Sequence, residues 1–164
     1  MKKTLTMILV GAALLFLVHS ELLSKRAEAA SAVGTARQVV IAAIAISNIS
    51  DLNFGTGVPG EPQKAVPAGA VDTLENGSFQ VSGQPNTAYT IILPSSPVTM
   101  ATGTGGANER ISVHHFQSYP QSGANGMLDG NGKQTLLIGA TRDALKPNQV
   151  PGNYMGTYTI AVVY

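Results

Sequence analysis

The sequence contains no cysteine, which excludes a disulfide framework and a cysteine-anchored lipid, so the fold must depend on packing alone. Charged residues are few, at 12% of the chain, and the part beyond residue 29 carries six basic and seven acidic residues. This balance, without a basic cluster, gives no footprint for nucleic acid or an anionic membrane. No apolar run beyond residue 29 approaches the roughly 20 residues of a transmembrane helix, so we expect no stable membrane insertion of that part.

Motifs that carry catalysis or hold a cofactor are missing as well. His114 and His115 are adjacent, and neighbouring residues of a regular strand point to opposite faces, so we expect that they cannot chelate one metal ion. Residues 129–133 resemble a fragment of a calcium loop but lack its further carboxylates, and we interpret them as a hairpin turn. We therefore expect a protein that is not an enzyme and needs no cofactor.

The N-terminus predicts export. Lys2 and Lys3 precede an apolar run over residues 7–18, and Ala27-Glu28-Ala29 is a small-x-small cleavage pattern. We interpret residues 1–29 as a signal peptide, residues 30–37 as a flexible N-terminus and residues 38–164 as one domain. The expected location is the periplasm, the cell surface or the extracellular space.

The C-terminal residues 152–164 alternate apolar or aromatic residues with smaller or polar ones, which is typical of a strand with one buried face. The chain ends while this strand is still running, so we expect an edge that is open to another chain. The residues predicted for the inward face of this C-terminal edge strand are Tyr154, Tyr158, Ile160, Val162 and Tyr164.

Short β-rich segments, separated by Gly, Pro and Asn turns, recur along the rest of the chain, and none has a helical period. We predict strands at residues 39–46, 51–55, 64–71, 79–82, 89–93, 110–116 and 135–140, with residues 127–128 completing a hairpin. This pattern favours an all-β fold, an immunoglobulin-like antiparallel β-sandwich of about seven or eight strands. The predicted core consists of Phe54, Phe79, Val81, Tyr89, Ile91, Leu93, Val113, Leu136, Ile138, Tyr158, Ile160 and Val162.

Several of these segments also carry a family likeness. The stretches DLNFG at 51–55, FQVSG at 79–83, YTIILP at 89–94, LDGNGKQTL at 128–136 and the C-terminal 152–164 resemble the bacterial domain-of-unknown-function family 4402. More distantly, they resemble the spore-coat-U and archaic chaperone–usher pilin group. That resemblance implies a pilin-like, incomplete sandwich whose missing strand comes from a periplasmic chaperone and then from the next subunit. Members of the spore-coat-U group commonly carry a disulfide near the first strand, and this chain has none.

Two functions follow. In the first, the protein is a structural subunit of a fimbrium or coat, joined to other subunits of its kind by strand exchange. The segment at 39–46 is apolar on both faces, as a donated strand would be, and its predicted assembly residues are Val39, Val40, Ile41, Ala43, Ile44, Ala45 and Ile46, within a candidate donor strand at 38–47. In the second, the protein is a self-complete secreted sandwich that binds a ligand such as a glycan through loops 103–108 and 118–126.

Overall fold

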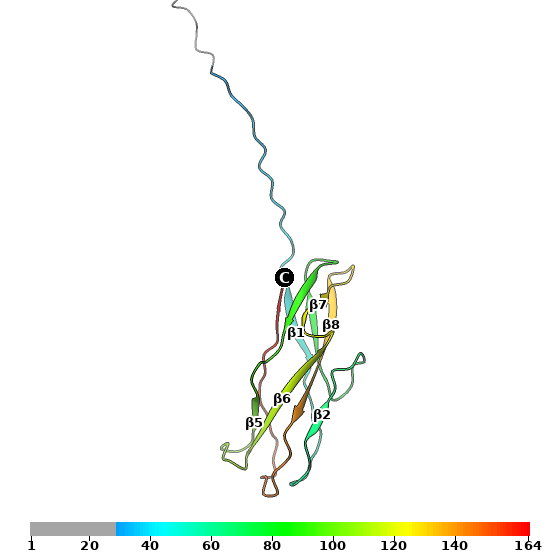
Figure 1. The fold of residues 1–164 in the computed structure, drawn as a ribbon, viewed down its shortest axis with the longest axis vertical. Coiled ribbons are helices and arrows are strands. Elements are labelled where there is room, and N and C mark those ends of the chain that lie inside the picture. Colours follow the sequence, from blue (N-terminus) through cyan, green and yellow to red (C-terminus); the bar gives the residue numbers. More distant parts are fainter. Residues whose placement is uncertain (1–28) are drawn as a thin grey trace, which may run out of the picture. The chain divides into compact units, whose positions relative to one another are not determined.

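The computed structural model describes residues 29–164, and the predicted signal peptide therefore lies, except for its last residue, outside the described residues. Residues 40–164 form one compact unit. The chain folds as an all-β sandwich of antiparallel strands, as predicted, but with nine strands among the described residues instead of seven or eight (Figure 1). These residues contain no helix long and apolar enough to cross a membrane.

The larger sheet contains six strands. Its order is β1 (Ala45–Ser50), β3 (Gly77–Ser82), β8 (Lys133–Arg142), β6 (Arg110–Tyr119) and β5 (Val98–Ala101), and β2 (Lys64–Val66) also pairs with β8. β2 ends at Val66, well before residue 71 where the predicted strand ended, because Pro67 has no N–H to continue the ladder. β5 was not predicted, and the predicted strand at 51–55 is not a strand in the structure.

The smaller sheet contains β7 (Gly123–Met127), β4 (Ala88–Ile92) and β9 (Ala161–Val163), in that order. The turn at 129–133 exists, and the Asp129 side chain accepts hydrogen bonds from the amides of Asn131 and Lys133, both at 2.8 Å. These bonds hold the pKa of Asp129 below its ordinary value. The predicted hairpin is wrong in its pairing, since β7 pairs with β4 and the turn connects the two sheets.

The main core lies between the sheets and contains ten of the twelve predicted core residues, all but Phe54 and Val113. Its buried members are Val81, Tyr89, Ile91, Leu128, Leu136, Ile138 and Ile160, with Ile44, Ile46, Phe79, Leu93, Phe116, Tyr158 and Val162 packed against them. Strict alternation in β3 and β4 accounts for these contacts, because every second side chain of a strand faces the same side. A second cluster contains Phe54, Val66, Val113 and Ala140.

Candidate functional site: a groove where the second sheet is missing

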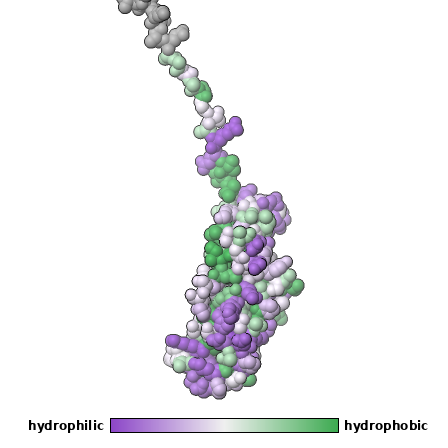
Figure 2. Space-filling model, in the orientation of Figure 1, coloured by the Kyte–Doolittle hydropathy of each residue, from purple (hydrophilic) through white to green (hydrophobic). Residues whose placement is uncertain are grey.

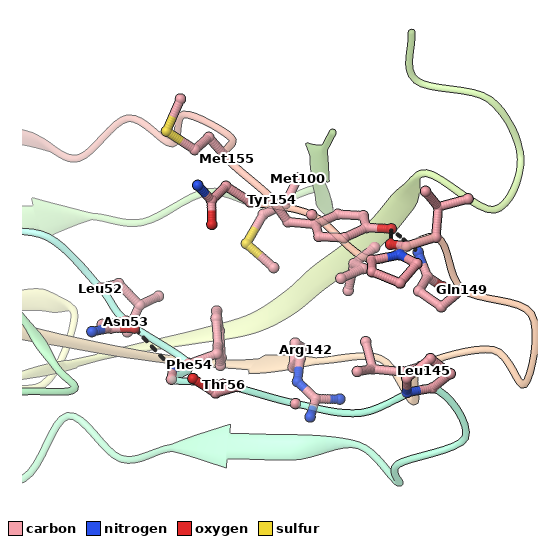
Figure 3. Close-up of a pocket in the computed structure, with 18 residues that line it drawn as sticks. Leu52, Asn53, Phe54, Thr56, Met100, Arg142, Leu145, Gln149, Tyr154 and Met155 are labelled. Atoms are coloured by element: carbon pink, nitrogen blue, oxygen red, sulfur yellow. Dashed lines mark hydrogen bonds between the residues drawn. The ribbon is translucent and has the colours of Figure 1, made fainter. Parts of the chain in front are cut away.

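The second core cluster is covered differently from the first. Its strand residues come from β2, β5, β6 and β8 of the larger sheet, and none comes from the smaller sheet. Among the described residues, no strand of the smaller sheet therefore packs on the half of the larger sheet that these strands form. Two irregular segments, 52–57 and 149–155, lie over it instead, and a cavity of about 610 Å³ opens between them (Figure 3). We call this cavity the groove.

The first wall of the groove continues the chain beyond β1. Gly55 has a positive φ of 70°, and its amide donates a 2.8 Å hydrogen bond to the Asn53 side chain, which turns the backbone away from the sheet (Figure 3). The Lys64 ammonium group donates to the carbonyl oxygen of Phe54 at 3.0 Å and pairs with Glu75 at 2.8 Å. This wall is thus fixed by side chains and not by a strand ladder.

The opposite wall is the start of the C-terminal segment. Gln149 is buried and donates to the Tyr154 hydroxyl at 2.8 Å and to the carbonyl oxygen of Asn108 at 2.9 Å (Figure 3). Gly156 allows a close approach, because a Cβ there would lie 2.5 Å from the backbone oxygen of Thr99 in β5. Met155 pairs with Ala101, but residues 156–160 belong to no strand. They lie beyond the lining of the groove, which ends at Met155, and the side chains of Tyr158 and Ile160 pack on the main core.

The floor of the groove is mainly apolar. Phe54, Met100, Ile111 and Leu145 line it, and the Arg142 side chain lies at its end (Figure 3). Arg142 is 3% exposed, and its guanidinium group donates to Glu61 at 2.5 Å and to two backbone carbonyl oxygens. With those acceptors in place the charge is satisfied within the protein, and the groove offers mainly apolar contact.

The predicted assembly segment at 39–46 is divided in two by the structure. Val39, Val40 and Ile41 are 87%, 84% and 51% exposed and belong to no strand. From Ala42 onwards the segment belongs to its own domain. Ala42 exchanges hydrogen bonds with Gln84 and Tyr164, Ile44 and Ile46 pack on the main core, and Ala43 and Ala45 are exposed. The strand itself starts only at Ala45 and extends to Ser50.

The predicted C-terminal strand is shorter than expected, and its residues lie in three places: the groove wall, the main core and a contact with Ala42 and Gln84. Ile160 is buried, and Tyr158 and Val162 pack on the main core. Tyr154 is part of the groove wall, and the Tyr164 hydroxyl accepts from the Gln84 amide at 2.6 Å and donates to the carbonyl oxygen of Ala42 at 3.0 Å. β9 is the last strand of its sheet, and Met155, Val163 and Tyr164 expose apolar surface along this segment. Figure 2 shows apolar side chains on the side of the domain where the segment lies.

Tyr158 provides a stability prediction. Its hydroxyl is buried without a hydrogen-bond partner among residues 29–164, and burial, aided by the charge of Asp51, raises its pKa to about 12 from 10.0. Because folding favours the neutral phenol, this contribution is fully present below pH 10 and is lost as the pH rises towards 12. Tyr158→Phe should change the free energy of unfolding at pH 7 by less than about 1 kcal/mol and reduce its loss above pH 10. Urea unfolding at pH 7 and at pH 11 measures both, and a large loss at pH 7 would show that the hydroxyl is satisfied after all.

The expectation that the two histidines point to opposite faces is wrong. A bulge in β6 shifts the register between His114 and Gln117, and His115 has a positive φ of 50°. Ile111 and Val113 face the core, and the extra residue lets Phe116 take the next inward position while His115 is exposed. The two imidazoles therefore lie together, with their Nδ1 atoms 2.8 Å apart, and His114 Nε2 lies 2.9 Å from Asp143. No group of three or more possible ligand side chains is arranged around one metal position in residues 29–164.

The two loops predicted as a ligand site are not brought together. Residues 103–108 precede the first residue of β6, Arg110, and residues 118–126 follow from its end at Tyr119. A ten-residue strand separates its ends by about 30 Å, so one small ligand cannot span both loops.

The fold and the groove together define an all-β sandwich that is closed along part of its length and open along the rest. The family profile described as "Domain of unknown function (DUF4402)" matches residues 44–164, and the chain belongs to this family. No curated protein and no solved structure matches the sequence. The matched region begins two residues after Ala42, so the exposed Val39, Val40 and Ile41 lie before it.

Proposed function

We propose that this protein is an exported structural subunit of the bacterial cell surface, pilin-like in its assembly, and that residues 30–41 of one copy insert as a strand into the groove of the next. The observation that carries the proposal is the half-covered larger sheet, where two irregular segments and no second sheet leave a cavity with an apolar floor. Strand addition at such a place is β-augmentation, in which backbone hydrogen bonds give affinity and side-chain pockets give specificity. A periplasmic chaperone is the expected partner before assembly, and no catalytic step is involved.

The exposed N-terminal residues fit the part of donor. Val33, Val39 and Val40 are more than four-fifths exposed, which is costly surface for a segment that stays in water. In an extended strand Val39 and Ile41 lie on one face and Val40 on the other. Twelve residues reach about 40 Å when extended, which is enough to follow the groove wall and to link two domains. The donor is thus placed before Ala42, because Ile44 and Ile46 pack in their own domain.

Removal of residues 30–41 from the exported protein should abolish assembly and leave the domain folded. The mass in solution, measured by light scattering, should fall to that of a monomer, and a synthetic peptide of residues 30–41 should bind the deleted protein saturably at one to one. A deleted protein that stays folded and monomeric and ignores the peptide would refute strand exchange through this segment.

A matched pair of substitutions tests the orientation of the donor. Replacing Val39 and Ile41 together by Asp places unpaired carboxylates over the apolar floor, so assembly should be lost. Val40→Asp places its charge on the opposite face and should preserve assembly. Val39 and Val40 are more than four-fifths exposed and Ile41 about half, so unchanged urea unfolding of both variants is the control for the fold. Equal assembly by both variants would mean that this face does not enter the groove.

A further inference from the structure

A second feature lies apart from the groove, on the outer side of β6, and involves His114, His115 and Asp143. We propose that the two histidines form a chelate for a divalent transition metal ion with square-planar preference, Cu²⁺ above all. The function proposed above requires no metal, so this site is independent of it. Three separate observations lead to the proposal.

The spacing of the two imidazoles suits one geometry in particular. Two nitrogen ligands at about 2.0 Å from a metal lie roughly 2.8 Å apart when they are cis in a square plane, and roughly 3.3 Å apart in a tetrahedron. The two Nδ1 atoms are 2.8 Å apart. The ring planes are inclined at 85°, with centroids 4.4 Å apart, so the side chains meet at their Nδ1 edges and are not stacked.

Asp143 determines which nitrogen of His114 is free. A carboxylate can only accept, so His114 Nε2 carries the proton that it donates to Asp143 over 2.9 Å. The Nδ1 atom of neutral His114 is then unprotonated, and it accepts from Nδ1–H of His115. A carboxylate on the outer nitrogen of a ligating histidine fixes the ring and raises its basicity, as in known metal sites. The backbone of Asp143 is held in place, because its N–H group donates to the carbonyl oxygen of Ser112 at 2.9 Å.

The strained backbone conformation of His115 indicates that the fold holds the two imidazoles together. A non-glycine residue at positive φ costs of order 1 kcal/mol or more, and such residues cluster at functional sites. Here the bulge that creates the positive φ also moves His115 from the inward to the exposed face. On metal binding, the His115 proton moves from Nδ1 to Nε2, both Nδ1 lone pairs face the ion, and water completes the coordination. Among divalent first-row ions Cu²⁺ binds such a nitrogen pair most tightly.

Titration of the full chain with CuCl₂ and with NiCl₂, followed by calorimetry and electron paramagnetic resonance, tests the site. We expect one saturable Cu²⁺ site with a tetragonal spectrum that shows two equivalent imidazole nitrogens, and weaker Ni²⁺ binding. His115→Gly suits the positive φ and removes one ligand, so Cu²⁺ affinity should fall at least tenfold and one nitrogen should disappear from the spectrum. Asp143→Ala should weaken binding by about 10- to 100-fold while both nitrogens remain.

Gln117→Ala is the matched control, because Gln117 is an exposed residue of the same strand outside the histidine pair, and it should leave the site unchanged. Unchanged unfolding midpoints of the metal-free variants exclude loss of the fold as the cause. Binding by His115→Gly equal to that of the parent, or a parent spectrum with a single imidazole nitrogen, would overturn the proposal.

Discussion

Gly139→Ala is expected to destabilise the domain by about 3 kcal/mol, the upper end of the usual cost of overpacking, although it adds only one methyl group within β8. A Cβ at this position would lie 2.3 Å from both the Ala68 nitrogen and the Val66 oxygen, and 2.5 Å from the Pro67 carbonyl carbon. All three atoms are backbone, so no side-chain rotation relieves the contact. The chain must shift at β8 or at residues 66–68, which cross over β8 and are called the crossing segment. Either shift disturbs the pairing of β2 with β8.

The crossing segment cannot move freely, because buried Asn76 holds it. The Asn76 amide nitrogen donates to the carbonyl oxygens of Ala68 and Val71 at 2.9 and 3.0 Å, and its side-chain oxygen accepts from the Thr73 amide at 2.8 Å. Urea unfolding measures the loss. Gly130→Ala is the matched control, since a Cβ there would meet nothing within 4 Å, and it should stay within about 0.5 kcal/mol. If Gly139→Ala also lost no more free energy of unfolding than this control, the crossing segment would not lie so close to β8.

The sequence predicts the closed part of the sandwich well, for a physical reason. β3, β4 and the buried part of β8 alternate regularly or are apolar throughout, and one-sided burial leaves few other arrangements. All twelve predicted core residues are buried or pack against one of the two clusters. Local pattern and global packing agree here, so residue spacing alone was enough.

The open part was not predictable in the same way, because it depends on contacts between residues that are distant in the sequence. The C-terminal strand has only three residues, because Gly152 and Gly156 allow the chain before it to lie close to Thr102 and to the backbone of β5. β5 itself was too short to predict. Phe54 was correctly predicted to face inward, but Gly55 turns its segment away from the sheet. No local sequence pattern predicts the groove between residues 52–57 and 149–155.

The histidine pair had a signal that could have been found. The inward apolar positions of this segment are odd at Ile111 and Val113 and even at Phe116, so the alternation changes phase at the two histidines. A change of phase within one strand requires an extra residue, which is a bulge, and a bulge brings neighbouring side chains to the same side. The burial of Arg142 had no such signal, because its partner Glu61 lies 81 positions away.

The ion pair of Glu61 with Arg142 gives the second large effect. Glu61→Ala should lower the free energy of unfolding by about 3 kcal/mol, near the lower limit for breaking a buried ion pair, because Glu61 is partly exposed. The Arg142 guanidinium would lose its carboxylate partner and keep only backbone acceptors, and the Val58 amide would lose its 3.0 Å acceptor. Glu61→Leu combined with Arg142→Met removes both charges and should recover most of the loss, since an apolar pair of similar volume avoids desolvation. The free energies of unfolding of the single and double variants, measured in urea, decide the matter. If Glu61→Ala alone were as stable as the parent, water would reach the guanidinium, and the floor of the groove would be wetter at this end than its lining indicates.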